Sequence, residues 1–297
     1  MSKKPPLIII VGPTASGKTA LSIKLAKKFN GEIVSADSRQ VYRGMDIGTG
    51  KASKSEQRQV KHHLLDIVDP RHKYNVSHFQ KDAVKAIKQI QKRGKLPFLV
   101  GGTAFWIDVV VYDLDLPSVK PNRTLRKRLT KLPPSKLYSM LKKIDPDRAR
   151  MIDKNNPYRI IRAIEIVKST GKPVPKITKK SPYDLAWLGI TLPRTKLNKR
   201  IDKRLAARMQ KGMVSEVIGL LKRGVPASRL LSIGLEYRYV TLYLQGKLTK
   251  QEMMAQLRAA IHQYAKRQMT WWKRNDQIHR IKSFAEAEKI LRFRNIA

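Results

Sequence analysis

Residues 12–19 read Gly-Pro-Thr-Ala-Ser-Gly-Lys-Thr, which matches the full pattern G-x-x-x-x-G-K-[ST] of a phosphate-binding loop. The loop comes directly after the apolar run 7–11 and before a stretch, 18–29, that suits a helix. In such an arrangement a buried strand delivers the loop, Gly12 and Gly17 let backbone N–H groups turn inward, and the helix points the positive end of its dipole at the anion. Lys18 adds a mobile positive charge, and Thr19 adds a hydroxyl for Mg²⁺. The stretch therefore predicts a polyphosphate site without identifying the polyphosphate.

The N-terminal third alternates apolar runs with helical patterns, which is typical of a parallel α/β sheet. We expect strands at 7–11, 32–35, 64–68 and 96–100, and helices at 18–29 and 77–94. Ser77 is the expected N-cap of the second helix, and Gly94 its stop. Ligands of such sheets bind at the carboxyl ends of the strands, so the residues that follow each strand are candidate site residues.

From about residue 116 the chain becomes basic, rich in proline and helical in pattern. Its clearest helix begins at Asn156-Pro157 and ends at Gly171. An apolar run returns at 185–192 and is followed by helical stretches at 196–211, 214–223 and 251–273, the last with a Thr249–Glu252 capping box. We therefore expect a P-loop NTPase-like α/β core, a parallel sheet flanked by helices, formed by 1–115 and 184–297. An all-helical basic subdomain is expected as an insertion at 116–183.

The charge balance indicates a polyanionic partner. The 297 residues include 63 lysine and arginine against 22 acidic residues, a net charge of +41. Residues 116–183 alone hold 19 basic and 4 acidic side chains, which suggests an electrostatic arm for a nucleic acid backbone. A merely solvated basic surface is the alternative.

Composition also excludes several classes. The absence of cysteine rules out disulfides, thiolate zinc sites and cysteine nucleophiles. No apolar run approaches the length of a membrane span, and the N-terminal run leads straight into the phosphate loop, so we expect no membrane contact and a cytoplasmic location.

Two strand ends carry further polar groups. Asp37 follows the second strand, where it is either a general base or metal-linked carboxylate, or the cap of the next turn; Ser38, Arg39 and Gln40 could hydrogen-bond a nucleobase. The fourth strand ends in Gly101-Gly102-Thr103, followed by Phe105 and Trp106, which suits close approach to a ligand or simply a tight turn with core aromatics. Because an ATPase usually has an acidic residue there, only Asp66 and Asp69 remain as Walker B candidates.

Three more groups are ambiguous. Arg159 and Arg162 share a helix face beside Tyr158, which suits a phosphate ester or a solvated surface. Residues 264–274 interleave basic and aromatic side chains, which fits either nucleic acid stacking or helix-end packing. The pair His62-His63 is interpreted as structural, or at most adjacent to substrate.

Seven stretches occur in the order in which they occur in one known family, and they cover nearly the whole chain: GPTASGKT, DSRQVY, HHLLDIVDP, GGTAFW, NPYRIIRAIEI, IGLEYR and YAKRQMTWW. The chain resembles the tRNA dimethylallyltransferases, or tRNA isopentenyltransferases. It departs from that family at Phe105-Trp106 and in the stretch 234–237, which affects pocket detail. The resemblance implies transfer of a dimethylallyl group from dimethylallyl diphosphate to N6 of the adenosine immediately 3′ of the anticodon.

Site roles follow from the resemblance. It implies a diphosphate cradle of Gly12, Pro13, Thr14, Ala15, Ser16, Gly17, Lys18 and Thr19, with Thr19 binding the Mg²⁺ cofactor. It implies Asp37 as general base, with Lys18, Thr19, Thr103 and Arg126 completing the catalytic set. Contacts to the tRNA anticodon arm, with the adenosine flipped into the pocket, are implied for Asp37, Ser38, Arg39, Gln40, Thr103, Arg126, Tyr158, Arg159, Ile160, Ile161 and Arg162.

Arg123 is the alternative to Arg126, and we expect a monomer. The rival functions are a P-loop small-molecule kinase, which leaves the basic insertion unexplained, and a nucleic-acid-binding ATPase, which leaves Asp37 and residues 101–103 unexplained.

Overall fold

The computed structural model describes residues 4–175 and 180–294. By its internal contacts the chain divides into two compact units, Met1–Asp113 with Lys180–Ala297, and Leu114–Lys179. Residues 176–179 of the expected insertion lie outside the described residues.

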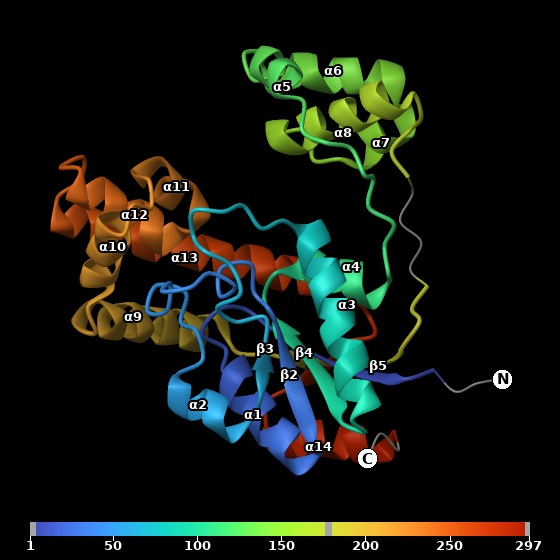
Figure 1. Ribbon diagram of the computed structural model, residues 1–297, viewed down its shortest axis with the longest axis vertical. Coiled ribbons are helices and arrows are strands. Elements are labelled where there is room, and N and C mark those ends of the chain that lie inside the picture. Colours follow the sequence, from blue (N-terminus) through green and yellow to red (C-terminus); the bar gives the residue numbers. More distant parts are fainter. Residues whose placement is uncertain (1–3, 176–179, 295–297) are drawn as a thin grey trace. The chain divides into compact units, whose positions relative to one another are not determined.

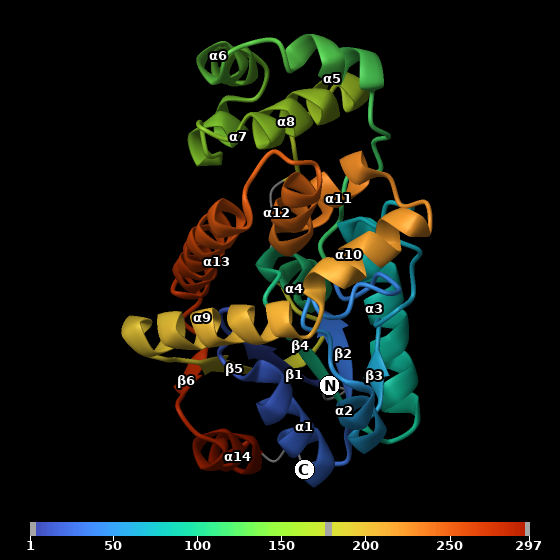
Figure 2. The same ribbon diagram turned by 90° about the vertical axis from the view of Figure 1, so that its left-hand side faces the viewer.

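The first unit is built on a sheet of six parallel strands in the order β3-β2-β4-β1-β5-β6 (Figures 1 and 2). The strands are β1 (Pro6–Val11), β2 (Gly31–Ala36), β3 (His62–His63), β4 (Leu96–Gly101), β5 (Asp184–Ile190) and β6 (His279–Ile281). β1 lies between β4 and β5, with Ile9 opposite Leu99 on one side and Trp187 on the other. A strand paired on both edges and covered on both faces is necessarily apolar throughout, as the run 7–11 is.

Helices cover both faces of this sheet (Figures 1 and 2). α1 (Lys18–Lys28) and α14 (Phe284–Phe293) pack together against one face, and α3 (Val76–Lys92) and α4 (Ala104–Val111) pack together against the other. The remaining helices of this unit are α2 (Lys54–Gln59), α9 (Arg194–Gln210), α10 (Met213–Lys222), α11 (Ala227–Ile233), α12 (Leu235–Leu244) and α13 (Lys250–Trp272). The expected fold class is confirmed.

Local signals explain several helix ends. The Thr249–Glu252 capping box is present at the start of α13 as expected. The N-cap of α3, however, is Asn75 and not Ser77, because the Asn75 side chain accepts hydrogen bonds from both Ser77 N and His78 N.

The expected strand at 64–68 is wrong. Leu64 and Asp66 have φ angles of +64° and +56°, a left-handed conformation that breaks an extended strand. β3 is reduced to His62–His63, and Val68 makes only an isolated bridge to Tyr42. The short elements α2, α4, α11, α12, β6 and α14 were not located by sequence reasoning.

The second unit is a helical cluster of α5 (Arg123–Leu129), α6 (Pro134–Ile144), α7 (Pro146–Met151) and α8 (Pro157–Thr170). α8 begins and ends as expected: Asn156 caps it, Pro157 is its first residue, and Gly171 follows it in the left-handed conformation. Ile160, Ile161, Ile164, Leu137 and Leu141 form the core of this unit.

Candidate active site

The phosphate loop turns tightly between β1 and α1. Gly12 (φ +153°) and Gly17 (φ +100°) have backbone angles that favour glycine, and Ala15 also has a positive φ of 60°. Lys18 folds back over the loop, and its Nζ donates to the carbonyl oxygens of Gly12 at 3.0 Å and Pro13 at 2.8 Å. The loop therefore places backbone N–H groups and an ammonium group around one small volume at the start of α1.

The electrostatics of Lys18 suit an anion. Burial, followed by repulsion from the nearby Arg204, lowers the pKa of Lys18 to about 8, although Asp37 acts to raise it. A diphosphate in the loop would supply the negative charge that this buried ammonium group lacks.

Magnesium fits the same loop. Thr19 lines the pocket at the first turn of α1, and the buried Oγ of Ser16 has no hydrogen-bond partner among the described residues. No cluster of three or more His, Asp or Glu side chains that could hold a metal occurs in residues 4–175 and 180–294. These donors fit Mg²⁺, which is usually bound through a few protein oxygens together with substrate phosphates and water.

Asp37 lies immediately after β2 and lines the pocket. Its Oδ1 accepts hydrogen bonds from Arg39 N at 2.8 Å and Gln40 N at 3.4 Å, so the carboxylate is oriented by the turn that it caps. Ser38 N donates to Thr103 Oγ1 at 3.3 Å, which joins the ends of β2 and β4. The carboxylate is thus held rigidly at the sheet edge where the loop also lies.

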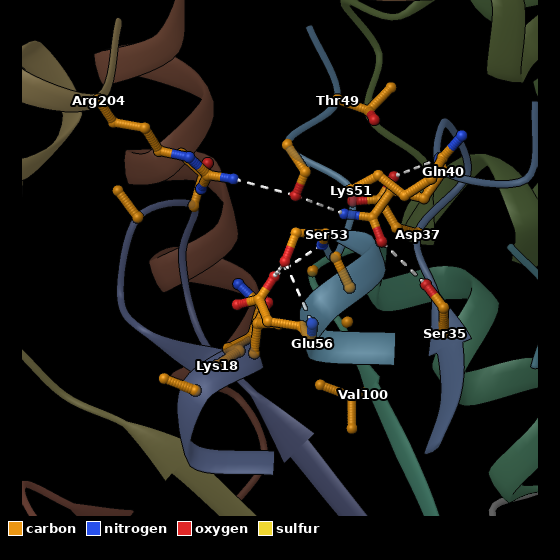
Figure 3. Close-up of a pocket in the computed structure, with 18 of the residues that line it drawn as sticks. Lys18, Ser35, Asp37, Gln40, Thr49, Lys51, Ser53, Glu56, Val100 and Arg204 are labelled. Carbon is orange, nitrogen blue, oxygen red and sulfur yellow. Dashed lines mark hydrogen bonds between the residues drawn. The ribbon is translucent and has the colours of Figure 1, made fainter. Parts of the chain in front are cut away.

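Gln40 also faces the pocket, whereas Ser38, Arg39 and Thr103 lie beside it and outside its lining. Gln40 accepts from Ser35 Oγ at 3.2 Å and donates to Gly50 O at 3.3 Å (Figure 3). Burial lowers the pKa of Arg39, although Asp37 raises it. The polar groups that follow Asp37 are therefore fixed by neighbours on both sides.

One face of α9 supplies cations that sequence reasoning missed. Arg200, Arg204 and Arg208 are spaced four residues apart and all line the pocket. Arg200 Nη1 donates to Ser16 O, and Arg204 Nη2 donates to Gly50 O, each at 3.3 Å. Burial, followed by repulsion from Arg208, lowers the pKa of Arg204 to about 10. In the sequence, the arginines repeated every four residues in the stretch 200–208 were the signal that could have predicted this cationic face.

Gln268 on α13 is a second missed residue. Its Oε1 accepts from Thr14 N at 2.9 Å, and its Nε2 donates to Gly102 O at 2.9 Å. One buried amide therefore joins the phosphate loop to the end of β4. This assigns part of the stretch 264–274: Tyr264 and Gln268 line the pocket, while Trp272 is buried beside Trp187, with ring centroids 6.3 Å apart.

These groups surround one pocket of about 850 Å³, which is cationic on its helix side (Figure 3). Basic residues in its lining are Lys18, Lys51, Lys54, Arg200, Lys203, Arg204, Arg208 and Lys211, and acidic ones are Asp37, Asp46, Glu56 and Asp66. The volume exceeds that of a small diphosphate alone, so the pocket has room for a second substrate group.

The two Walker B candidates have other partners. Asp66 accepts from Lys51 Nζ at 2.5 Å, and Lys51 is only 2% exposed. Asp69 is hydrogen-bonded by the Arg71 side chain and backbone N–H. Asp66 lines the pocket but its carboxylate is paired with Lys51, whereas Asp69 lies outside the pocket lining and is paired with Arg71.

The histidine pair divides between two roles. His63 Nε2 lies 2.7 Å from the buried Glu32 carboxylate, which also binds Arg93, whereas His62 lines the pocket. The former is structural, and the latter is adjacent to the site.

In the second unit, Glu165 is a shared hydrogen-bond partner of Arg126 and Arg162. This carboxylate is 1% exposed and accepts two hydrogen bonds from Arg126 (2.8 and 2.6 Å), one from Arg162 (2.5 Å) and one from Asn122 N (2.7 Å). Burial opposes ionisation of Glu165, but these hydrogen bonds outweigh it and hold its pKa below the usual value. Arg123, the alternative to Arg126, is exposed at the start of α5.

The stretch 158–162 is mixed. Tyr158 is 81% exposed and Arg159 is also exposed, as an RNA-binding surface requires. Ile160 and Ile161 are instead 0% and 5% exposed, because they form the core of the unit. The expectation of tRNA contact is therefore corrected for their side chains, which pack the helices together.

No helix within the described ranges is both long and apolar enough to cross a membrane.

A parallel sheet with a phosphate loop, a carboxylate at the neighbouring strand end and a cationic helix wall places the chain in the class of P-loop-type α/β proteins. Family models described as IPP transferase and Isopentenyl transferase match residues 40–275 and 5–73, respectively. The chain belongs to the IPP transferase family.

Two of its relatives are similar over nine tenths or more of their length. A protein of Roseiflexus sp. (strain RS-1), named tRNA dimethylallyltransferase, is 46% identical over 275 residues, covering 91% of this chain and 90% of the relative. The crystal structure of a tRNA isopentenylpyrophosphate transferase from Bacillus halodurans is 38% identical, with a TM-score of 0.73 and coverage of 98% and 95%. A eukaryotic dimethylallyltransferase, captured acting on tRNA, is 29% identical with a TM-score of 0.79, covering 100% of this chain and 78% of that one.

Proposed function

We propose that this chain transfers a dimethylallyl group from dimethylallyl diphosphate to N6 of the adenosine immediately 3′ of the anticodon in tRNA. The products are N6-isopentenyladenosine and diphosphate. The observation that carries the proposal is the placement of Asp37 and the loop around Lys18 in the lining of one pocket. In this arrangement a base and a diphosphate cradle face the same space.

The donor binds with its diphosphate in residues 12–19. Backbone N–H groups of the loop, the Lys18 ammonium group and Arg200 would contact the phosphate oxygens, and the Thr19 hydroxyl would hold Mg²⁺. When bound, Mg²⁺ neutralises charge on the diphosphate oxygens. These groups stabilise the departing diphosphate. The negative charge on this leaving group is the largest charge that develops in the reaction.

The acceptor is activated by Asp37. An exocyclic adenine amine is a poor nucleophile because its lone pair is delocalised into the ring. As the C1–O bond of the donor breaks and the C1–N6 bond forms, the Asp37 carboxylate accepts the proton from N6. Gln40 in the lining, and Ser38, Arg39 and Thr103 beside it, contact the flipped adenosine and its neighbours.

The basic second unit binds the anticodon arm. Arg126, Tyr158, Arg159 and Arg162 contribute side chains to this surface, and its excess of basic residues offsets the cost of turning the adenosine out of its stack, a few kcal/mol. The Glu165 carboxylate orients two of these arginines.

One experiment tests the reaction. Unmodified tRNA, dimethylallyl diphosphate and Mg²⁺ should give prenylated adenosine, detected by nucleoside mass spectrometry, without any ATP. A strict requirement for ATP, or nucleotide hydrolysis without base modification, would instead support a kinase or an ATPase.

A variant tests the base. Asp37→Asn should keep tRNA affinity in a filter-binding assay but lose on the order of 10²-fold or more in turnover, because the amide does not accept the N6 proton. Unchanged turnover would remove Asp37 from the mechanism.

A further inference from the structure

Residues 46–53, here called the wall loop, form one side of the pocket opposite the phosphate loop. Seven of the eight residues, all but Gly48, line it: Asp46, Ile47, Thr49, Gly50, Lys51, Ala52 and Ser53. The loop is turned tightly, since Gly50 N donates to Ile47 O and Lys51 N donates to Asp46 O. Its position therefore sets the shape of the pocket.

A single carboxylate on α10 fastens the wall loop. Glu216 accepts hydrogen bonds from three consecutive backbone N–H groups, those of Asp46 (2.8 Å), Ile47 (2.7 Å) and Gly48 (3.0 Å). A charged acceptor makes such bonds roughly twice as strong as neutral ones. Glu216 does not itself line the pocket.

Tyr237 on α12 fixes Glu216 in turn. Its hydroxyl donates to Glu216 Oε1 at 2.7 Å, and the Tyr237 side chain is 1% exposed. The same ring leaves no room at Gly48, where an added Cβ would lie 2.7 Å from Tyr237 Cζ. The Tyr237 ring and the Glu216 carboxylate together hold the wall loop in its position.

The Gly50 carbonyl oxygen connects the wall loop to two side chains of the site. That oxygen accepts from Gln40 Nε2 on the acceptor side and from Arg204 Nη2 on the helix wall, each at 3.3 Å (Figure 3). The backbone at Gly50 is in the left-handed conformation (φ +60°), and an added Cβ would collide with Arg204 and Arg208. One backbone oxygen therefore orients two site side chains.

We propose that Glu216 is a positioning residue, which acts through the wall loop to set Gln40 and Arg204 for the reaction. The inference rests on the proposed function, because Gln40 and Arg204 matter only if both substrates occupy this pocket. Misplacing site groups by about 1 Å is known to cost up to on the order of 10²-fold in rate.

A double-mutant cycle tests the proposal. Glu216→Gln should lower kcat/KM for prenyl transfer roughly tenfold in the wild-type background, since one amide cannot accept from three N–H groups. In a Gln40→Ala, Arg204→Ala background, the same change should cost at most about twofold, because its targets are gone. Tyr237→Phe, which keeps the three loop bonds but removes the hydroxyl donor to Glu216 Oε1, should give a smaller loss with the same background dependence.

A matched control is Glu252→Gln, which removes a capping carboxylate from α13 outside the site and should change stability but not kcat/KM. Equal losses from Glu216→Gln in both backgrounds would show a general structural effect and overturn the proposal, as would no loss in the wild-type background. If Glu216→Gln does not fold, the cycle is run with Tyr237→Phe. Absence of prenylated product from the wild-type chain would instead count against the proposed function itself.

Discussion

Gln268→Met should both destabilise the first unit and weaken donor binding. Methionine keeps the volume of the side chain but removes both of its hydrogen bonds, those to Thr14 N and Gly102 O. The bond to Gly102 O is buried, so leaving that oxygen unpaired costs about 2 kcal/mol, while Thr14 N faces the pocket and costs about 1 kcal/mol because water replaces its partner. The expected loss is about 3 kcal/mol of unfolding free energy, or roughly 6–10 °C in melting temperature.

Tryptophan fluorescence is the appropriate assay. All 4 tryptophans lie in the first unit, so the signal follows that unit alone. KM for dimethylallyl diphosphate should rise roughly tenfold, since a loosened Thr14 corresponds to about 1.4 kcal/mol of lost donor binding.

Gln91→Met provides the comparison. Gln91 donates to Pro6 O at 3.1 Å, at the amino end of β1 and away from the site. Its loss should lower the melting temperature slightly and leave KM unchanged. A shift below about 2 °C for Gln268→Met, with an unaltered donor KM, would refute the reasoning, because two lost hydrogen bonds cannot be so inexpensive in a buried setting.

Three further predictions concern charge. Burial lowers the pKa of Lys18 to about 8, so the ammonium group loses its proton as the pH rises through 8. Affinity for dimethylallyl diphosphate, measured by a binding titration, should therefore fall between pH 7 and 9. A Lys18→Arg variant, whose charge does not titrate in this range, should show constant affinity in the same titration. Glu165→Gln should destabilise the second unit by about 2 kcal/mol, measured by hydrogen exchange of the α8 amides. The loss is modest because Arg126 and Arg162 keep access to solvent. Hydrogen-exchange protection equal to that of the wild type would contradict this prediction. Finally, tRNA affinity should fall steeply with salt, and a filter-binding slope near zero would show that backbone phosphates are not bound by the basic unit.

The fold could be predicted largely because its signals are local. The loop 12–19 and the apolar runs on either side of it specify strand, turn and helix without long-range information, and Asn156 and Pro157 mark α8 in the same way. The strand expected at 64–68 failed because apolar composition does not reveal that Leu64 and Asp66 adopt positive φ.

The site was predicted only where the function of a residue is visible in its own stretch. Asp37 follows a strand, and its position at the pocket follows from that. Gln268, Glu216 and Arg204 act on segments far away in the sequence, so their roles emerge only when the chain is folded. The expectation of tRNA contact failed for the Ile160 side chain because a helix that exposes Tyr158 and Arg159 on one side carries core residues on the other.

The hydrogen bond between Gln268 and Thr14 has a consequence for synthesis. The two residues are separated by 254 positions, so a ribosome makes the phosphate loop well before the amide that supports it. Likewise, the second edge of β1 is paired only after β5 has been made. A nascent chain therefore carries the complete loop sequence before its supporting contacts exist, and the hydrogen bond from Thr14 N forms only when α13 has emerged.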